Sequence, residues 1–172
     1  MTCDRTARPC SAGFNPPPEP ANSLGMDGLL TGLADAGIAV RCFAADEVDA
    51  ISDGKGAYVL LLRIDHAVVF GLRGRAPVSL EPGWLVYAGS ARGPGGMQAR
   101  LRRHFRKDKV LHWHVDRLTK IAGEIVAVPL SDESECGIID RLLQSPKFVV
   151  AVRGFGNTDC GMCETHLLRY SG

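Results

Sequence analysis

The chain has 172 residues, of which 45% are hydrophobic and 23% are charged, and its formal net charge is +1. This composition is that of an ordinary globular protein and excludes the fibrous and disordered classes. The net charge indicates no particular partner. The sequence contains no apolar run of about 18 residues, so no membrane-spanning helix is expected.

The N-terminal third of the chain predicts little regular structure. Residues 1–25 contain five prolines and almost no apolar periodicity, which predicts a disordered tail without the apolar stretch of an export signal. Residues 26–55 predict a weak helix around Leu29, Leu30 and Leu33, followed by a polar linker. The six cysteines are scattered apart from one Cys-x-x-Cys, so we expect reduced thiols and a cytoplasmic protein.

The densely apolar residues 56–172 predict one domain. The runs 57–64 and 67–72 are separated by Asp65-His66 and predict a β-hairpin. A third strand over 83–90 follows a Pro-Gly turn. The remaining expected elements are helices over 97–107 and about 112–120, a strand over 125–130, a helix over 133–144, a strand over 148–152 and a closing segment over 164–170. Because strands and helices do not alternate regularly, the predicted class is α+β.

Positive charge is concentrated after the third expected strand. Residues 92–109 contain seven Lys or Arg residues and one Asp, a net charge of 7 − 1 = +6. Such focused charge, on a helix that begins at a glycine-rich loop, suits a phosphodiester backbone. A solvated helix face is the alternative. The residues that we expect to contact nucleic acid are Arg92, Arg102, Arg103, Arg106, Lys107 and Lys109.

Two of the three tyrosines lie in short glycine-bearing strand segments, Gly56-Ala57-Tyr58 and Tyr87-Ala88-Gly89. Glycine within a strand often marks a place where another group approaches the backbone closely. If the two strands pair, both phenols could enter one pocket. The alternative is two core aromatic residues whose hydroxyls are hydrogen-bonded.

Several short segments, taken together, resemble the GIY-YIG nuclease superfamily. They are Gly56-Ala57-Tyr58, Tyr87-Ala88-Gly89, a helix with Arg100-Leu101-Arg102-Arg103-His104, and a later helix that bears Glu135. More closely, the chain resembles the "domain of unknown function 123" branch, which is sometimes fused to endonuclease III-type DNA glycosylases. That closer resemblance includes His112-Trp113-His114-Val115-Asp116 and Gly154-Phe155-Gly156. It covers about residues 55–170 and implies a small domain with a central, mainly antiparallel sheet flanked by helices.

The resemblance implies a divalent-metal-dependent endonuclease that acts on DNA in repair, with a DNA glycosylase as a candidate partner. By position, Tyr58 would be the general base or would orient the attacking water, and Tyr87 would position that network. Arg100 would hold the scissile phosphate, and Glu135 would bind one Mg²⁺ or Mn²⁺. His104 could lower the pKa of Tyr58. Supporting positions are Gly56, Gly89, Ser90, His112, His114 and Asp116.

Two other functions are kept as alternatives: an inactive nucleic-acid-binding or accessory module, and a small zinc-bearing structural domain. A structural role is also open for Glu135, because Asp132-x-x-Glu135 resembles a capping box. Against it, Glu135 aligns with the apolar positions Ile138 and Leu142, where a carboxylate usually has a partner.

A second cluster, Cys160-x-x-Cys163-x-x-His166, has the spacing of zinc ligands, and Asp159 or Cys136 could complete a tetrahedron. A zinc site normally shows two clear ligand pairs in the sequence, and only one is present here. Buried thiols with a hydrogen-bonded histidine are therefore the favoured interpretation, and zinc is the alternative.

Overall fold

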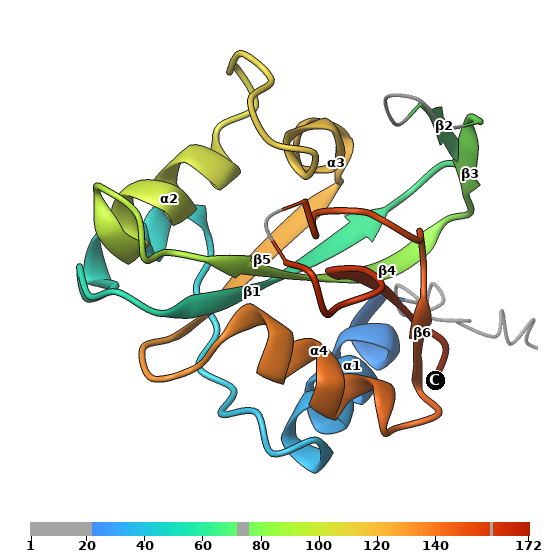
Figure 1. Cartoon of the computed structure of the whole chain (residues 1–172), viewed down its shortest axis with the longest axis horizontal. Helices are drawn as coiled ribbons and strands as arrows, with labels where there is room; N and C mark the ends of the chain where they lie inside the picture. Colours follow the sequence, from blue (N-terminus) through green and yellow to red (C-terminus); the bar gives the residue numbers. More distant parts are fainter. Residues whose placement is uncertain (1–21, 72–75, 159) are drawn as a thin grey trace, which may run out of the picture.

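The computed structural model describes residues 22–71, 76–158 and 160–172, and its elements are shown in Figure 1. In chain order they are α1 (Asn22–Asp35), the 3-10 helix η1 (Ala45–Ala50), β1 (Ala57–Ile64), β2 (Val68–Phe70), β3 (Val78–Leu80), β4 (Gly83–Ser90), α2 (Gly96–Phe105), α3 (Asp116–Ile121), β5 (Glu124–Leu130), α4 (Glu135–Leu143), β6 (Phe148–Val150) and β7 (Leu167–Tyr170).

A central antiparallel sheet with helices on both faces forms the domain, which confirms the predicted α+β class. Within the described ranges, five strands form this sheet in the order β5-β1-β4-β7-β6, and every neighbouring pair is antiparallel. β2 and β3 form a separate two-stranded ribbon. Helices α2 and α3 lie on one side of the sheet, and α1 and α4 lie on the other (Figure 1).

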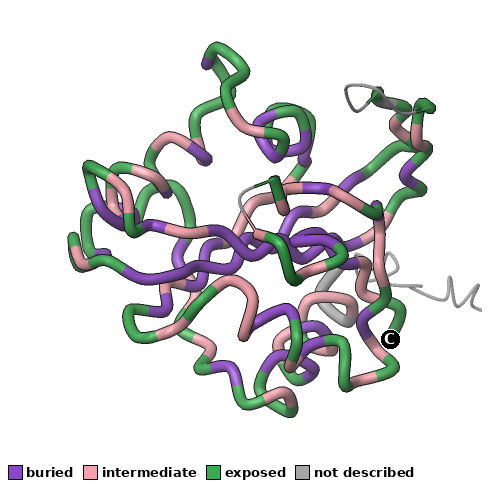
Figure 2. Tube along the Cα trace, in the orientation of Figure 1, coloured by how far each residue is buried: buried purple, intermediate pink, exposed green. Residues whose placement is uncertain are grey.

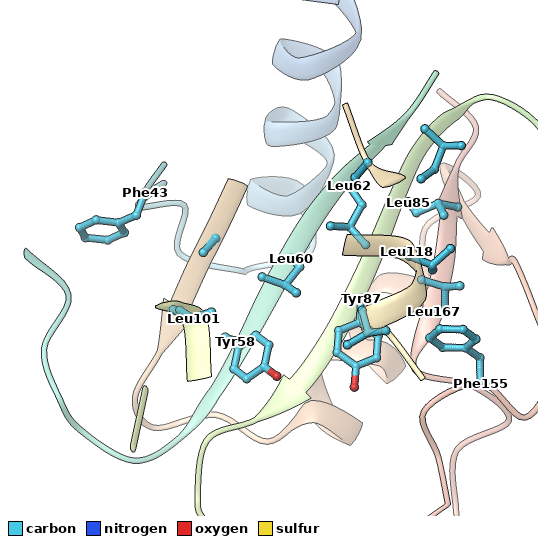
Figure 3. Close-up of a cluster of buried hydrophobic side chains, with 14 of the residues drawn as sticks. Phe43, Tyr58, Leu60, Leu62, Leu85, Tyr87, Leu101, Leu118, Phe155 and Leu167 are labelled. Atoms are coloured by element: carbon cyan, nitrogen blue, oxygen red, sulfur yellow. The ribbon is translucent and has the colours of Figure 1, made fainter. Parts of the chain in front are cut away.

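The strand β1 is buried on both faces because its sequence, AYVLLLRI, is apolar at nearly every position. Successive residues of a strand point to opposite sides. Leu60 and Leu62 therefore belong to the core cluster between the sheet and the helices α2 and α3, which Figure 3 shows. Val59 and Leu61 belong to the second core cluster, between the sheet and the helices α1 and α4. Buried residues follow the central strands of the sheet (Figure 2).

The predicted hairpin between 57–64 and 67–72 is wrong. β1 pairs with β4 and β5, whereas β2 pairs with β3. A strand that is apolar on both faces needs a long partner on each side. The 8-residue β4 and the 7-residue β5 supply these partners, and the 3-residue β2 cannot.

The N-terminal helix begins earlier than predicted. α1 begins at Asn22, so residues 22–25 belong to the helix rather than to the expected tail, and residues 1–21 lie outside the described residues. Leu29 and Leu33 are fully buried in the cluster under the sheet, and this packing outweighs the poor helix propensity of the glycines. Among the described residues, no helix is both long and apolar enough to cross a membrane.

Candidate functional site

A cavity of about 300 Å³ opens where the first residues of β1 meet the last residues of β4. It brings together residues from the central strands, α2, the turn before α3, the first turn of α4 and the segment between β6 and β7. The lining residues are Tyr58, Tyr87, Gly89, Ser90, Arg100, His112, Trp113, His114, Glu135, Gly156, Thr158, Cys160 and His166. Of these lining residues, Thr158 belongs to no motif that indicates a site, and Gly156 belongs only to one of the segments that carry the family resemblance.

The two tyrosines enter the cavity from neighbouring strands. In the β1–β4 register, Tyr58 lies opposite Gly89 and Leu60 lies opposite Tyr87, and the two phenols point the same way in Figure 3. A methyl group at Gly89 would lie 2.4 Å from the Cζ and Oη atoms of Tyr58, so only glycine leaves room for this ring. At the start of β1, a methyl group at Gly56 would lie 2.5 Å from the carbonyl oxygens of Leu130 and Ser131.

Replacing Gly89 by alanine should therefore displace the Tyr58 ring and lower the free energy of unfolding by ~1–3 kcal/mol, as overpacking of a well-filled interior does. Gly54→Ala is the matched control, because a methyl group there would make only an ordinary contact at 3.9 Å. Urea denaturation of the two variants measures the difference. Equal stabilities would show that the ring of Tyr58 is not confined by Gly89.

Tyr58 is hydrogen-bonded to a buried, neutral histidine. The distance from Tyr58 Oη to His104 Nε2 is 2.7 Å, and His104 Nδ1 lies 3.9 Å from Asp116 Oδ1. Burial, and then the charge of Lys109, lower the pKa of His104 to about 3. With the ring proton on Nδ1, facing the carboxylate, Nε2 accepts the Tyr58 hydrogen bond.

The phenol of Tyr58 keeps its proton in this environment. Burial, and then the neighbouring Tyr87, raise the pKa of Tyr58 well above its usual value, and the charge of Glu135 adds to the rise. His104 therefore does not lower the pKa of Tyr58 as the sequence suggested, because its own ring is neutral. Tyr58 can instead orient a water molecule through its oxygen lone pairs while its O–H donates to His104.

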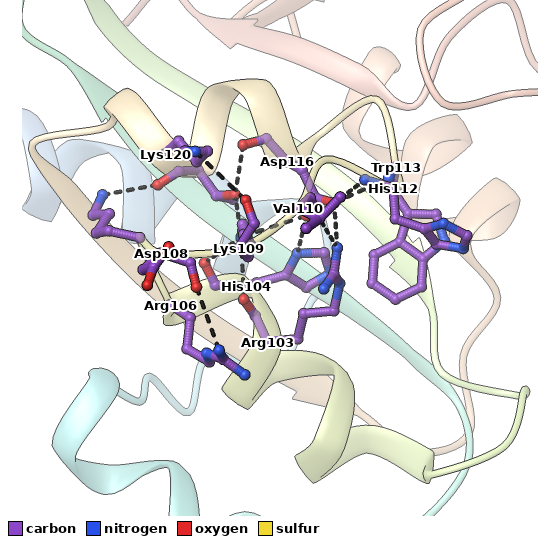
Figure 4. A network of polar contacts seen from close by, with 12 residues as sticks. Arg103, His104, Arg106, Asp108, Lys109, Val110, His112, Trp113, Asp116 and Lys120 are labelled. Atoms are coloured by element: carbon purple, nitrogen blue, oxygen red, sulfur yellow. Dashed lines mark hydrogen bonds and ion pairs between the residues drawn. The ribbon is translucent and has the colours of Figure 1, made fainter.

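A buried ionic cluster around Asp116 holds α2 against α3 (Figure 4). The carboxylate of Asp116 accepts hydrogen bonds from the backbone N–H groups of His112 and Trp113 and from Arg103, and Lys109 Nζ lies 3.4 Å from it. Burial would raise the pKa of Asp116, but these hydrogen bonds outweigh it and hold the pKa below its usual value. The two backbone bonds also form a turn over residues 112–116. The helix α3 therefore begins at Asp116 and not at the predicted residue 112.

This cluster contradicts one predicted nucleic-acid contact. Lys109 is buried, and its ammonium donates to the carbonyl oxygens of Arg103 and His104 and to the Thr119 hydroxyl, so it cannot reach a phosphate backbone. Lys107 donates to the carbonyl oxygens of Thr119 and Ala122.

The other predicted basic residues are placed differently. Arg103 donates to Asp116 and to the Val110 carbonyl oxygen. Arg92, Arg102 and Arg106 are exposed, although Arg102 also pairs with the exposed Asp49.

Arg100 reaches the cavity from α2. Its guanidinium lies 4.9 Å from the ring centroid of Trp113, a cation–π arrangement that fixes its orientation. Its Nε is buried, and among the described residues this atom has no hydrogen-bond partner. A buried donor without a partner is costly. The cavity is therefore lined by a guanidinium whose position the Trp113 ring sets, and its positive charge suits an anionic ligand.

Glu135 also lines the cavity, and it does not cap its helix. The N-cap of α4 is Ser134, whose side chain accepts a hydrogen bond from the Gly137 N–H at 3.1 Å, so the alternative of a capping box with Asp132 is wrong. Within the described residues, the Glu135 carboxylate takes part in no hydrogen bond or ion pair of the protein. One carboxylate facing a polar cavity fits a hard divalent cation that takes its other ligands from water and phosphate.

Next to Glu135, four potential metal ligands converge. The ligand atoms of Cys136, Cys160, Cys163 and His166 all lie within 4.8 Å of one another, and this set could bind a metal such as zinc. Hydrogen bonding from the Met162 N–H is the main cause that lowers the pKa of the Cys160 thiol to about 6. Cys136 is the fourth potential ligand, which the sequence left open, and the other candidate, Asp159, lies outside the described residues.

The family model described as "domain of unknown function DUF123" matches residues 57–172 of the chain. The match begins at β1 and includes the sheet, the cavity and the cysteine–histidine cluster. No curated protein and no solved structure matches the chain.

Proposed function

The chain belongs to the family of the domain of unknown function DUF123, and we propose that this domain is a divalent-metal-dependent endonuclease of the GIY-YIG type that hydrolyses DNA. The observation that carries the proposal is the convergence, on one cavity, of two phenols, an oriented guanidinium and a carboxylate that has no hydrogen bond or ion pair among the described residues. Phosphoryl transfer needs little covalent chemistry from the protein, and such groups supply the positioning and charge that it does need.

In this proposal, Arg100 binds the phosphate oxygens of the scissile bond, and a guanidinium can do so with two parallel hydrogen bonds. Glu135 would hold one Mg²⁺ or Mn²⁺, which stabilises the charge that develops on the phosphoryl oxygens. Tyr58 accepts a hydrogen bond from the attacking water. Because the charge of Glu135 is one cause of the raised pKa of Tyr58, neutralising that charge makes the phenol easier to deprotonate. Tyr87 lies beside it on β4.

A second candidate function is a nucleic-acid-binding module without catalysis. The raised pKa of Tyr58 favours it, because a protonated phenol is no base. Both candidates predict DNA binding, and only the first predicts cleavage.

The test incubates the full chain with intact, nicked, branched and damaged DNAs in Mg²⁺, Mn²⁺ or chelator. Damaged DNAs belong in the panel because the sequence resemblance implies repair, with a DNA glycosylase as a candidate partner. Cleavage that needs the metal supports the endonuclease. Tight binding of these DNAs without any cleavage supports the module.

Salt dependence tests the DNA contact itself. Of the seven basic residues within 92–109, we assign four to phosphates: Arg92, Arg100, Arg102 and Arg106. The other three are Lys109, which is buried, Arg103, which is bonded to Asp116, and Lys107, whose ammonium is bonded to two carbonyl oxygens. If all four are used on duplex DNA, the logarithm of the binding constant should fall with the logarithm of salt concentration at a slope of about −3.6, or ~0.9 for each phosphate.

The triple change Arg92→Ala, Arg102→Ala and Arg106→Ala should reduce the magnitude of that slope by about 2.7. The control is Lys147→Ala, because Lys147 lies between α4 and β6 and pairs with Asp35 of α1, on the other side of the sheet. Fluorescence anisotropy over a salt series measures both slopes. A parent protein whose affinity does not change with salt would contradict any nucleic-acid contact through these residues.

A further inference from the structure

We propose that Cys136, Cys160, Cys163 and His166 bind one structural zinc ion that fastens the segment between β6 and β7 to the first turn of α4. The proposal does not depend on the endonuclease activity. It follows from the geometry of the four side chains, from their chemistry, and from the position of the segment that three of them belong to.

The four side chains already have nearly the spacing of a zinc tetrahedron. The distance between Cys136 Sγ and Cys160 Sγ is 3.2 Å, the distance from Cys136 Sγ to His166 Nε2 is 3.9 Å, and all four ligand atoms lie within 4.8 Å of one another. With Zn–S bonds of about 2.3 Å, the ligand atoms of a tetrahedral site lie ~3.8 Å apart. Shifts of less than about an ångström therefore convert the cluster into a coordination sphere.

The ligand chemistry selects zinc over the hard cation expected at Glu135. Three thiolates and an imidazole form a soft donor set that suits zinc, whereas Mg²⁺ and Mn²⁺ prefer oxygen ligands. Four protein ligands leave no open position, which is typical of structural rather than catalytic zinc. The Cys163 N–H donates to Cys160 Sγ at 3.2 Å, and such bonds to a ligating sulfur orient it toward the ion.

The segment that carries three of the ligands is long and has little regular structure. Residues 151–166, apart from the undescribed residue 159, contain no helix or strand. Loops of this length in compact domains are uncommon unless they are functional. The bond from Thr165 Oγ1 to the Val152 carbonyl oxygen joins its two ends, and Asn157 Nδ2 donates to the Cys163 carbonyl oxygen within it. A zinc ion would hold its middle, around Cys160 and Cys163, against α4.

The same ion would set the position of one wall of the cavity. Cys136 directly follows Glu135 in the first turn of α4, and Cys160 and His166 line the cavity. Binding the ion thus joins the turn that bears Glu135 to the part of the cavity wall that Cys160 and His166 form.

Elemental analysis of the full chain, purified with a reductant and without chelator, tests the proposal. We expect about one zinc per chain, and Cys163→Ser should reduce it to background. The matched control is Cys42→Ser. Cys42 is a free cysteine outside the four-ligand cluster and packs against the core between the sheet and the helices α1 and α4, so this variant should keep its zinc. Retention of full zinc by Cys163→Ser would overturn the assignment.

A second measurement covers the case in which Cys163→Ser does not fold. Cobalt titrated into the reduced, metal-free parent should give the thiolate charge-transfer and tetrahedral d–d absorption bands at one equivalent, and zinc should displace it. A reduced parent that binds neither ion would overturn the proposal. So would a freshly purified protein in which Cys136 and Cys160 are joined in a disulfide and no metal is found.

Discussion

Replacing Glu135 by glutamine should reduce metal-dependent DNA cleavage by ~100-fold or more while leaving DNA binding and folding intact. The variant keeps the size of the side chain and removes the only charge that we assign to the cation. A bound metal supplies several kcal/mol of transition-state stabilisation, and each ~1.4 kcal/mol corresponds to a factor of ten in rate. Single-turnover cleavage with a saturating concentration of protein measures the effect.

Two features of α4 make this variant informative. Ser134 caps the helix, so Glu135→Gln should leave the melting temperature unchanged, whereas loss of a true cap would cost ~1 kcal/mol. Glu133→Gln is the control, because Glu133 lies just before the helix, pairs with Arg141 and does not line the cavity. If Glu135→Gln cleaved as fast as the parent, the catalytic metal would have to bind elsewhere.

The largest loss of stability should follow replacement of Asp116 by asparagine, at about 3–5 kcal/mol of the free energy of unfolding. Asp116 is fully buried, and it is the acidic partner of both Arg103 and the buried Lys109. Removing its charge leaves the ammonium of Lys109 in the interior without its counter-charge, and such an uncompensated charge is costly. Urea unfolding followed by circular dichroism gives the value.

Two further variants test whether the loss of stability comes from leaving a charge buried rather than from breaking an ion pair. Asp49→Asn breaks the ion pair between Asp49 of η1 and Arg102, which lies on α2 next to Arg103. Because Asp49 is 79% exposed, the expected loss of stability is below about 1 kcal/mol. Adding Lys109→Met to Asp116→Asn should recover part of the loss, because it removes the unpaired charge. A cost for Asp116→Asn no larger than that for Asp49→Asn would contradict the buried ionic cluster.

The central strands could be predicted from the sequence because their signal is local. Residues 57–64 and 83–90 are apolar runs that start at or just after a glycine, and β1 and β4 have these bounds in the structure. A helix over 97–107 was likewise expected, and Met97 and Leu101 of α2 are buried one turn apart. The pairing of the strands could not be predicted in the same way, because it depends on which later strands are long enough to cover β1.

In the site, too, residues within short local motifs could be predicted, whereas contacts between distant residues could not. Tyr58, Tyr87, Arg100 and Glu135 stand in recognisable segments, and the structure places all four around one cavity. Lys109 was assigned to nucleic acid because its neighbours in the sequence are basic.

The roles of Lys109 and of the cysteine–histidine cluster depend on residues that are distant in the sequence. The acidic partner of Lys109, Asp116, lies across the turn between α2 and α3. The fourth member of the Cys3His cluster likewise depends on a distant contact: the sequence leaves Cys136 and Asp159 open, and Cys136 belongs to a different element from Cys160 and Cys163.

The most direct test of the central claim is to follow the oxygen of water during cleavage. The full chain is incubated in ¹⁸O-labelled water with Mg²⁺ or Mn²⁺ and the DNA of the panel that it cleaves fastest, and the new phosphate end is analysed by mass spectrometry. The account predicts one heavy oxygen on that phosphate, no labelled product with chelator, and ~100-fold less labelled product with Glu135→Gln. Cleavage without metal that leaves an unsaturated sugar end, or failure to cleave any DNA of the panel in either metal, would contradict it.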